Sequence, residues 1–271
     1  MKIFAIRDEI DKTKKDLAYL LYYEIEKRFY IELVDDIDPW DTPLILSSFA
    51  KKGEGTINSY WSKLWVQQRI VPSDRQNIGQ ILKENGLKTY DEYELLILSS
   101  GRCEQDSYYL TPMDQKEFPK EILSRLERKI EDVVPLSLSC LLVFFRDGTI
   151  RKCDLYEYFK KTQRFDILLK HTEYFNRVQI QAGGYGVSWD DNLFIPDSML
   201  YSMGKKLPLT ADDFRAFASE RVINSAEVAE LLNCSRQYVN ELVKTDKLHP
   251  IKASEKNTLF LKSEVLRRLW R

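Results

Sequence analysis

The chain has 271 residues, of which 44% are hydrophobic and 31% are charged. A chain with this apolar content can bury a core, which excludes global disorder, and its length favours two or three domains. No apolar run approaches the roughly 18 residues that span a bilayer, and the apolar run at the N-terminus is too short for a signal peptide. We therefore expect a cytoplasmic protein without membrane contact.

The residue types that bind metals are scattered along the chain. A zinc site requires soft ligands clustered in the sequence, and a disulfide framework is typical of small secreted chains. Here the cysteines lie far apart with no C-x-x-C pair, and there are only two histidines. We expect no metal and no cofactor. The residues concerned are Cys103, Cys140, Cys153, Cys234, His171 and His249.

The net charge is −1, from 41 Lys and Arg against 42 Asp and Glu, but the charge is unevenly distributed. Residues 1–115 carry 15 basic and 20 acidic side chains, whereas residues 209–271 carry 11 basic and 9 acidic ones. The basic excess of the last segment is small. It permits nucleic-acid binding without requiring it.

Residues 1–115 are predicted to form an α+β domain, because strand-forming segments are followed by segments with helical spacing. Ser73 is expected to cap one helix, and Gly86 to end it in the left-handed conformation. The predicted strands are residues 2–6, 17–24, 29–34 and 106–112, with a turn at 26–28, and the predicted helices are residues 42–52, 57–69, 73–85 and 91–100.

Residues 116–208 are predicted to form a smaller α+β domain. A charged amphipathic helix is expected over residues 116–131, with residues 133–135 marking its end. The Asp147-Gly148 pair favours a tight turn between two strands. The predicted strands are residues 138–146, 149–154, 175–181 and 185–189, and the predicted helices are residues 156–160, 165–169 and 200–203.

Residues 209–271 contain the clearest motif, two short helices separated by a break and followed by a hairpin. In order, we expect a helix over residues 225–232 capped by Ser225, a break at Asn233-Cys234, a helix over residues 236–243 capped by Ser235, a hairpin of residues 247–252 and 258–261, and a closing helix over residues 263–269.

This order of elements, together with the segment E-V-A-E-L-L-N-C-S-R-Q-Y-V-N-E-L-V, resembles the winged helix-turn-helix of the MerR and excisionase families. The resemblance implies that the second helix enters the major groove with its N-terminal residues near base edges, while basic residues reach phosphates. Arg suits guanine, and Gln or Asn suits adenine. The implied DNA-binding residues are Ser235, Arg236, Gln237, Tyr238, Asn240, Lys244, Lys252, Lys256 and Asn257.

An alternative is a helical module that has lost DNA binding and mediates only protein contacts. Glu241 on the second helix and the small basic excess leave this alternative open.

The N-terminal part carries an ordered series of motifs: residues 61–69, the segment I-V-P-S-D-R-Q-N-I at 70–78, the segment Y-D-E-Y-E-L-L at 90–96, and Gly101-Arg102. The series resembles the N-terminal subdomain of HipA-type serine/threonine kinases, which are toxins of bacterial toxin–antitoxin systems. The Gly-Ala that follows the glycine in that family is absent, since Cys103 follows Arg102 here.

No kinase body follows this subdomain, because nothing after Asp114 resembles one. The family also contains this subdomain as a separate small antitoxin that binds a truncated kinase. The resemblance therefore implies a module that binds a HipA-like kinase and is not itself a kinase. The alternative is a generic α+β domain used for dimerisation.

Segments of the middle part, such as F-R-D-G-T at 145–149 and G-V-S-W-D at 186–190, resemble a small bacterial domain of unknown function that is found near helix-turn-helix modules. This resemblance implies a fold and no activity.

Candidate enzyme motifs are weaker than their structural alternatives. Residues 182–186 are glycine-rich, but a phosphate-binding loop needs Gly-Lys-Ser/Thr opening a helix, so a hairpin turn is favoured. Asp190 and Asp191 are typical turn residues. We expect no catalytic residues.

Together these features predict a multidomain α+β protein with domains at residues 1–115, 116–208 and 209–271. We expect a DNA-binding transcriptional regulator, dimeric on double-stranded DNA, and in its sharper form an antitoxin-like repressor that docks a HipA-type kinase. The alternative is a non-enzymatic interaction or scaffold module that does not bind DNA.

Overall fold

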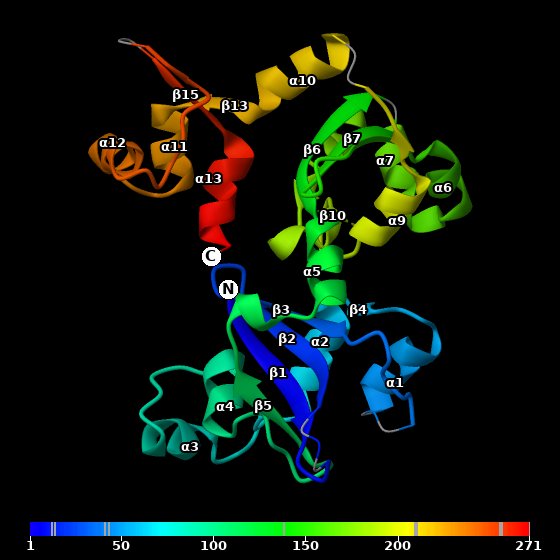
Figure 1. Ribbon diagram of the computed structural model, residues 1–271, viewed down its shortest axis with the longest axis vertical. Coiled ribbons are helices and arrows are strands. Elements are labelled where there is room, and N and C mark those ends of the chain that lie inside the picture. Colours follow the sequence, from blue (N-terminus) through cyan, green and yellow to red (C-terminus); the bar gives the residue numbers. More distant parts are fainter. Residues whose placement is uncertain are drawn as a thin grey trace. The chain divides into compact units, whose positions relative to one another are not determined.

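Figure 1 shows the computed structural model of the chain, which describes residues 1–11, 13, 15–40, 42, 44–137, 139–208, 211–254 and 257–270. The chain divides into two compact units, Met1–Leu123 and Ser124–Arg271. Both units contain helices and sheets, which confirms the α+β class. The division into three domains stays a prediction.

A five-stranded sheet forms the centre of the first unit. Its strands follow the order β4-β3-β2-β1-β5, and every neighbouring pair is antiparallel. The predicted hairpin turn before Arg28 is confirmed, with Lys27 in a left-handed conformation at a φ of 50°. The strands are β1 (Lys2–Asp8), β2 (Asp16–Tyr23), β3 (Arg28–Leu33), β4 (Thr56–Ile57) and β5 (Tyr108–Pro112).

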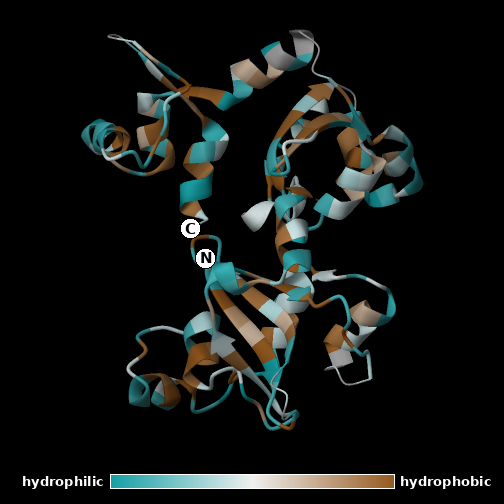
Figure 2. Cartoon of the chain, viewed as in Figure 1, coloured by the Kyte–Doolittle hydropathy of each residue, from teal (hydrophilic) through white to brown (hydrophobic). Residues whose placement is uncertain are grey.

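Helices pack against one face of this sheet and complete an apolar core. Leu46 and Phe49 from α1, Trp65 from α2 and Leu96 from α4 join the side chains of that face. Figure 2 shows hydrophobic residues along β1, β2 and β3. The helices are α1 (Leu44–Lys51), α2 (Ser59–Gln67), α3 (Ile78–Glu84), α4 (Glu92–Leu98) and the short 3-10 helix η1 (Gln115–Glu117).

The predicted cap at Ser73 is wrong. The helix begins at Ile78, after turns in which the Arg75 Nε donates to Asn77 Oδ1 at 3.0 Å. Turn hydrogen bonds occupy this segment, since the Arg75 amide donates to the Pro72 carbonyl at 3.3 Å and the Ile78 amide to the Arg75 carbonyl at 3.0 Å. The predicted end is confirmed, since Gly86 is left-handed with a φ of 71°.

The helix predicted at residues 116–131 is confirmed in part, and its predicted bounds are wrong. Helix α5 (Lys120–Glu127) is shorter, and the chain enters strand β6 (Ile130–Ser137) directly afterwards. Val133 and Val134, expected to mark the end of a helix, are fully buried in β6. Pairing of these β-branched residues with β7 favours the strand over the local helical pattern.

In the second unit, residues 124–208 form a four-stranded antiparallel sheet and a separate three-stranded one. The strand orders are β12-β8-β7-β6 and β11-β10-β9. Strand β11 has no counterpart among the predicted elements. The strands not yet bounded are β7 (Cys140–Phe145), β8 (Ile150–Asp154), β9 (Gln179–Ile180), β10 (Gly186–Ser188), β11 (Phe194–Pro196) and β12 (Lys205–Lys206).

A strand predicted at residues 175–181 is largely wrong. Phe175 ends helix α8, its ring stacks on Trp189 at 5.7 Å between centroids, and a turn at residues 176–177 leads to the strand. Only Gln179–Ile180 form a strand. The helices here are α6 (Tyr156–Lys161), η2 (Gln163–Phe165), α7 (Asp166–Lys170), α8 (Thr172–Phe175), η3 (Ala182–Gly184), α9 (Asp197–Met203) and α10 (Ala211–Arg221).

The glycine-rich segment before β10 is a turn, as predicted, and it packs tightly against β6. Gly184 has a φ of 80°, and a Cβ atom there would lie 2.2 Å from the Ile130 carbonyl oxygen. No helix in the described part of the chain is long and apolar enough to cross a membrane.

Candidate nucleic-acid interface

The C-terminal part consists of three helices and a three-stranded sheet. The strand order is β13-β15-β14, with antiparallel pairs. Strand β13 has no counterpart among the predicted elements, whereas the two helices, the hairpin and the closing helix were predicted. The elements are β13 (Val222–Asn224), α11 (Ser225–Leu231), α12 (Arg236–Lys244), β14 (Lys252–Ala253), β15 (Thr258–Leu261) and α13 (Lys262–Leu269).

Helix α11 is capped by Asn224, so the predicted cap at Ser225 is wrong. The Asn224 Oδ1 accepts hydrogen bonds from the amides of Ala226 and Glu227 at 2.8 and 3.2 Å. The Glu227 carboxylate accepts the Asn224 amide in return at 2.7 Å. This reciprocal capping box forms because β13 holds Asn224 in an extended conformation, which makes Ser225 the first helical residue.

A tight turn joins α11 to α12 at the predicted break. Asn233 adopts a left-handed conformation with a φ of 49°, which an asparagine tolerates well, and the Cys234 amide donates to the Ala229 carbonyl at 2.9 Å. The predicted cap of the second helix is confirmed, since the Ser235 hydroxyl accepts the Tyr238 amide at 3.2 Å. Both helices therefore have fixed starts.

A small apolar core fixes α12 against its neighbours. Val228 of α11, Val239 of α12 and Val265 of α13 are fully buried in one cluster, together with Phe260 of β15. Ala229 is also buried, and its small side chain suits a close approach of the two helices. Burial of one side of α12 leaves the other side free to meet a partner.

The exposed side of α12 is polar. At about 100° per residue, Gln237, Asn240 and Lys244 project opposite to Val239 and Leu242. Arg236 and Tyr238, which are also exposed, flank this row in the first turn. The exposed fraction of Tyr238 is 48%, which is high for an aromatic residue.

The hairpin supplies two further predicted residues. Lys252 lies in β14 and is exposed, and Asn257 is exposed at the start of the returning segment. The Ser254 hydroxyl accepts the Asn257 amide at 3.1 Å, which ties the two ends of the hairpin loop together. Lys256 lies outside the described residues.

Six of the nine predicted residues thus belong to α12 or its cap, and two belong to the hairpin. Ser235 is a capping residue, because its hydroxyl is engaged with the helix backbone. Lys247 was not predicted to be a site residue, although it is an exposed cation between α12 and the hairpin. Glu241 is exposed on α12, so the helix surface is not uniformly basic.

A histidine ties the loop after α12 to α13. The His249 Nδ1 lies 2.9 Å from the Glu264 carboxylate, which also accepts the His249 amide at 2.9 Å. The His249 Nε2 lies 3.2 Å from Asp246. The hydrogen bond with Glu264, followed by the charge of Asp246, raises the pKa of His249.

Residues 222–271 match the family model of a helix-turn-helix domain. This match and the two helices joined by the Asn233 turn show that the C-terminal part is a helix-turn-helix domain. No curated protein and no solved structure matches the chain. In the part of the chain that the structure describes, no three His, Cys, Asp or Glu side chains form a group that could hold a metal ion.

Proposed function

We propose that the chain is a cytoplasmic, non-enzymatic transcriptional regulator and that α12 is the helix that recognises its DNA. The main support is the row of exposed polar side chains on α12. A buried apolar core holds this helix in place within a helix-turn-helix domain. The major groove of DNA is about 12 Å wide and admits one such helix. Side chains at the start of that helix then lie near base edges.

The residue types divide the proposed contacts into two kinds. Arg236 pairs with guanine and Gln237 or Asn240 with adenine, because their paired donors and acceptors match the edges of those bases. Lys244, Lys252 and Lys256 would pair with phosphates of the DNA backbone. Such contacts position the domain without reading the base sequence. Asn257 would donate to a phosphate oxygen beside them.

Fluorescence anisotropy tests this proposal with the full chain, the duplex DNA upstream of its own gene, and a scrambled duplex of the same length. We expect tighter binding to the upstream DNA. Arg236→Ala should cost about 1–3 kcal/mol of binding free energy on that DNA, whereas Lys83→Gln, an exposed change in α3, should leave binding unchanged.

The competing proposal is a protein-interaction module that does not bind DNA. Exposed Glu241 supports it, since a carboxylate on the helix surface repels phosphates. Equal, weak binding to both duplexes would favour this alternative over a regulator.

The finer form of the proposal is a homodimeric, antitoxin-like repressor that docks a HipA-type kinase. Its support is the resemblance of residues 61–102 to a HipA-type N-terminal subdomain, whereas residues 115–271 do not resemble a kinase body. Two-fold DNA sites are common for this kind of domain and favour a dimer. Affinity purification of the full chain from its native cell should recover a kinase, and recovery of none would contradict the docking proposal.

A further inference from the structure

The first unit contains a pocket whose lining residues lie outside the helix-turn-helix domain. Its volume is about 250 Å³, larger than the roughly 150 Å³ that accommodates benzene in an engineered cavity. Three segments distant in the sequence form it: the β2–β3 hairpin, helix α2 and the start of α4. The lining residues are Tyr22, Lys27, Phe29, Lys63, Tyr90, Asp91, Glu92 and Tyr93.

The aromatic wall of the pocket is rigid and uncharged. The rings of Tyr22 and Tyr93 stack with centroids 4.3 Å apart and an interplanar angle of 6°. The ring of Phe29 stacks on Tyr22 at 4.6 Å. Burial raises the pKa of Tyr22 to about 12, so its hydroxyl stays protonated at neutral pH. This wall therefore brings no negative charge to the pocket.

The two carboxylates of the pocket already have donors. The Asp91 Oδ1 caps α4 by accepting the amides of Tyr93 and Glu94 at 3.0 and 3.3 Å, and its Oδ2 accepts from Lys27 at 2.8 Å. The Glu92 Oε1 accepts from Gln67 at 2.7 Å and lies 3.5 Å from the Lys63 Nζ. Both oxygens of Asp91 and the Oε1 of Glu92 are thus engaged by groups of the fold.

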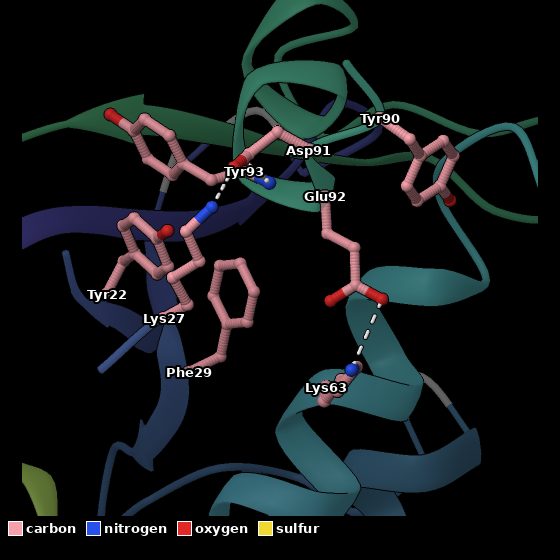
Figure 3. A pocket seen from close by; sticks show the side chains of 8 residues that line it. All are labelled: Tyr22, Lys27, Phe29, Lys63, Tyr90, Asp91, Glu92 and Tyr93. Carbon is pink, nitrogen blue, oxygen red and sulfur yellow. Dashed lines mark hydrogen bonds and ion pairs between the residues drawn. The ribbon is translucent and has the colours of Figure 1, made fainter. Parts of the chain in front are cut away.

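The two ammonium groups, in contrast, have donors to spare. Each lysine carries three N–H donors, and the side chains of Lys27 and Lys63 are 69% and 48% exposed. Figure 3 shows Lys27 reaching toward Asp91 and Glu92 reaching toward Lys63. Two cations thus flank one opening from different elements of the fold.

Lys27 occupies a backbone position that favours glycine or asparagine. Its φ of 50° is left-handed, a conformation that other residues seldom adopt. A lysine at this position places an ammonium group at the pocket, where the ion pair with Asp91 holds it. The ion pair therefore keeps one ammonium group beside the pocket opening.

We propose that this pocket binds a small organic anion, a molecule that carries a carboxylate or a phosphate group. The anionic group accepts hydrogen bonds from the spare donors of Lys27 and Lys63, and the remainder of the ligand lies against the aromatic wall. A site of this kind would give a DNA-binding chain a ligand-binding unit. The inference does not depend on the proposed DNA contacts.

Isothermal titration calorimetry on the full chain tests the site, with benzoate and inorganic phosphate as separate probes at constant ionic strength. We expect saturable binding of at least one probe. Lys63→Gln should weaken it at least about tenfold, because a hydrogen bond to a charged group contributes roughly 1.5–3 kcal/mol. A response to benzoate alone assigns a carboxylate ligand, and a response to phosphate alone assigns a phosphate ligand.

A fold control and a matched variant keep the result decisive. Lys63→Gln leaves the Lys27–Asp91 pair and the cap of α4 intact, so circular dichroism should show an unchanged fold. Lys83→Gln removes an exposed cation from α3, away from the pocket lining, and should bind like the native chain. Absence of saturable binding by both probes, or equal affinity in Lys63→Gln and the native chain, would overturn the proposal.

Discussion

Lys129 is a buried cation that contacts a carboxylate and an aromatic ring. Its Nζ lies 3.1 Å from Asp197 and 4.0 Å from the centre of the Tyr185 ring, and the two charged side chains are only 2% and 9% exposed. Removal of one member of a buried pair leaves the other charge without its counter-ion in a poorly solvated site. Substitution of only one partner is therefore expected to lower the free energy of unfolding strongly.

We predict that Lys129→Ala lowers the free energy of unfolding of the second unit by about 3–5 kcal/mol. Urea denaturation followed by circular dichroism measures this. Lys129→Met combined with Asp197→Leu should lose much less, because both charges are then replaced by apolar groups. A double variant as unstable as Lys129→Ala would contradict this account of the pair.

His249 provides a pH-dependent contact between the loop after α12 and α13. Its pKa is raised above 6.5, so the contact with Glu264 contributes most below pH 6.5 and is lost as the pH rises through the raised value. An NMR titration should show the imidazole titrating above the ordinary value, and Glu264→Gln should lower that pKa. An identical pKa in Glu264→Gln and the native chain would be inconsistent with the contact.

At the scale of elements, the start of α11 differs from the sequence prediction by one residue. Asn224 makes three hydrogen bonds of the capping box, whereas Ser225 is the first residue of the helix. We predict that Asn224→Ala lowers the free energy of unfolding by about 0.5–2 kcal/mol. Ser225→Ala is the matched control and should have little effect in the same thermal unfolding experiment. A larger loss of stability in Ser225→Ala than in Asn224→Ala would show instead that Ser225 is the cap.

The hairpin lysine Lys252 is expected to contribute to the salt dependence of DNA affinity. Lys252 is exposed in β14 and is proposed to neutralise one phosphate. Lys252→Gln should reduce the slope of log affinity against log salt concentration by about one unit and weaken binding to all duplexes alike. Anisotropy titrations in a salt series measure the slope, and an unchanged slope would exclude a phosphate contact at Lys252.

Local sequence signals predicted the ends of helices correctly where no tertiary contact opposed them. Ser235 and Gly86 mark helix ends through their own chemistry, and both predictions are confirmed. Predictions failed where a tertiary contact outweighs the local pattern. Val133 and Val134 pair with β7 in a sheet, and Phe175 stacks on Trp189, so neither segment takes the predicted structure.

At the scale of the whole molecule, the helix-turn-helix domain was predictable because about 50 consecutive residues encode it, and the family match covers residues 222–271. The anion pocket was not predictable, since Lys27, Lys63 and Asp91 come from separate segments that only the folded sheet and helices bring together. The resemblances proposed for residues 1–208 lie outside the family match and stay predictions.

The central claim is that the exposed side of α12 and the hairpin contact DNA. Amide chemical shifts of the isotope-labelled full chain, recorded while its upstream duplex is added, test this claim most directly. The account predicts the largest changes in α12 and around Lys252 and Asn257, and small changes in β1 to β4. Unchanged shifts in α12, or changes confined to the first unit, would contradict it.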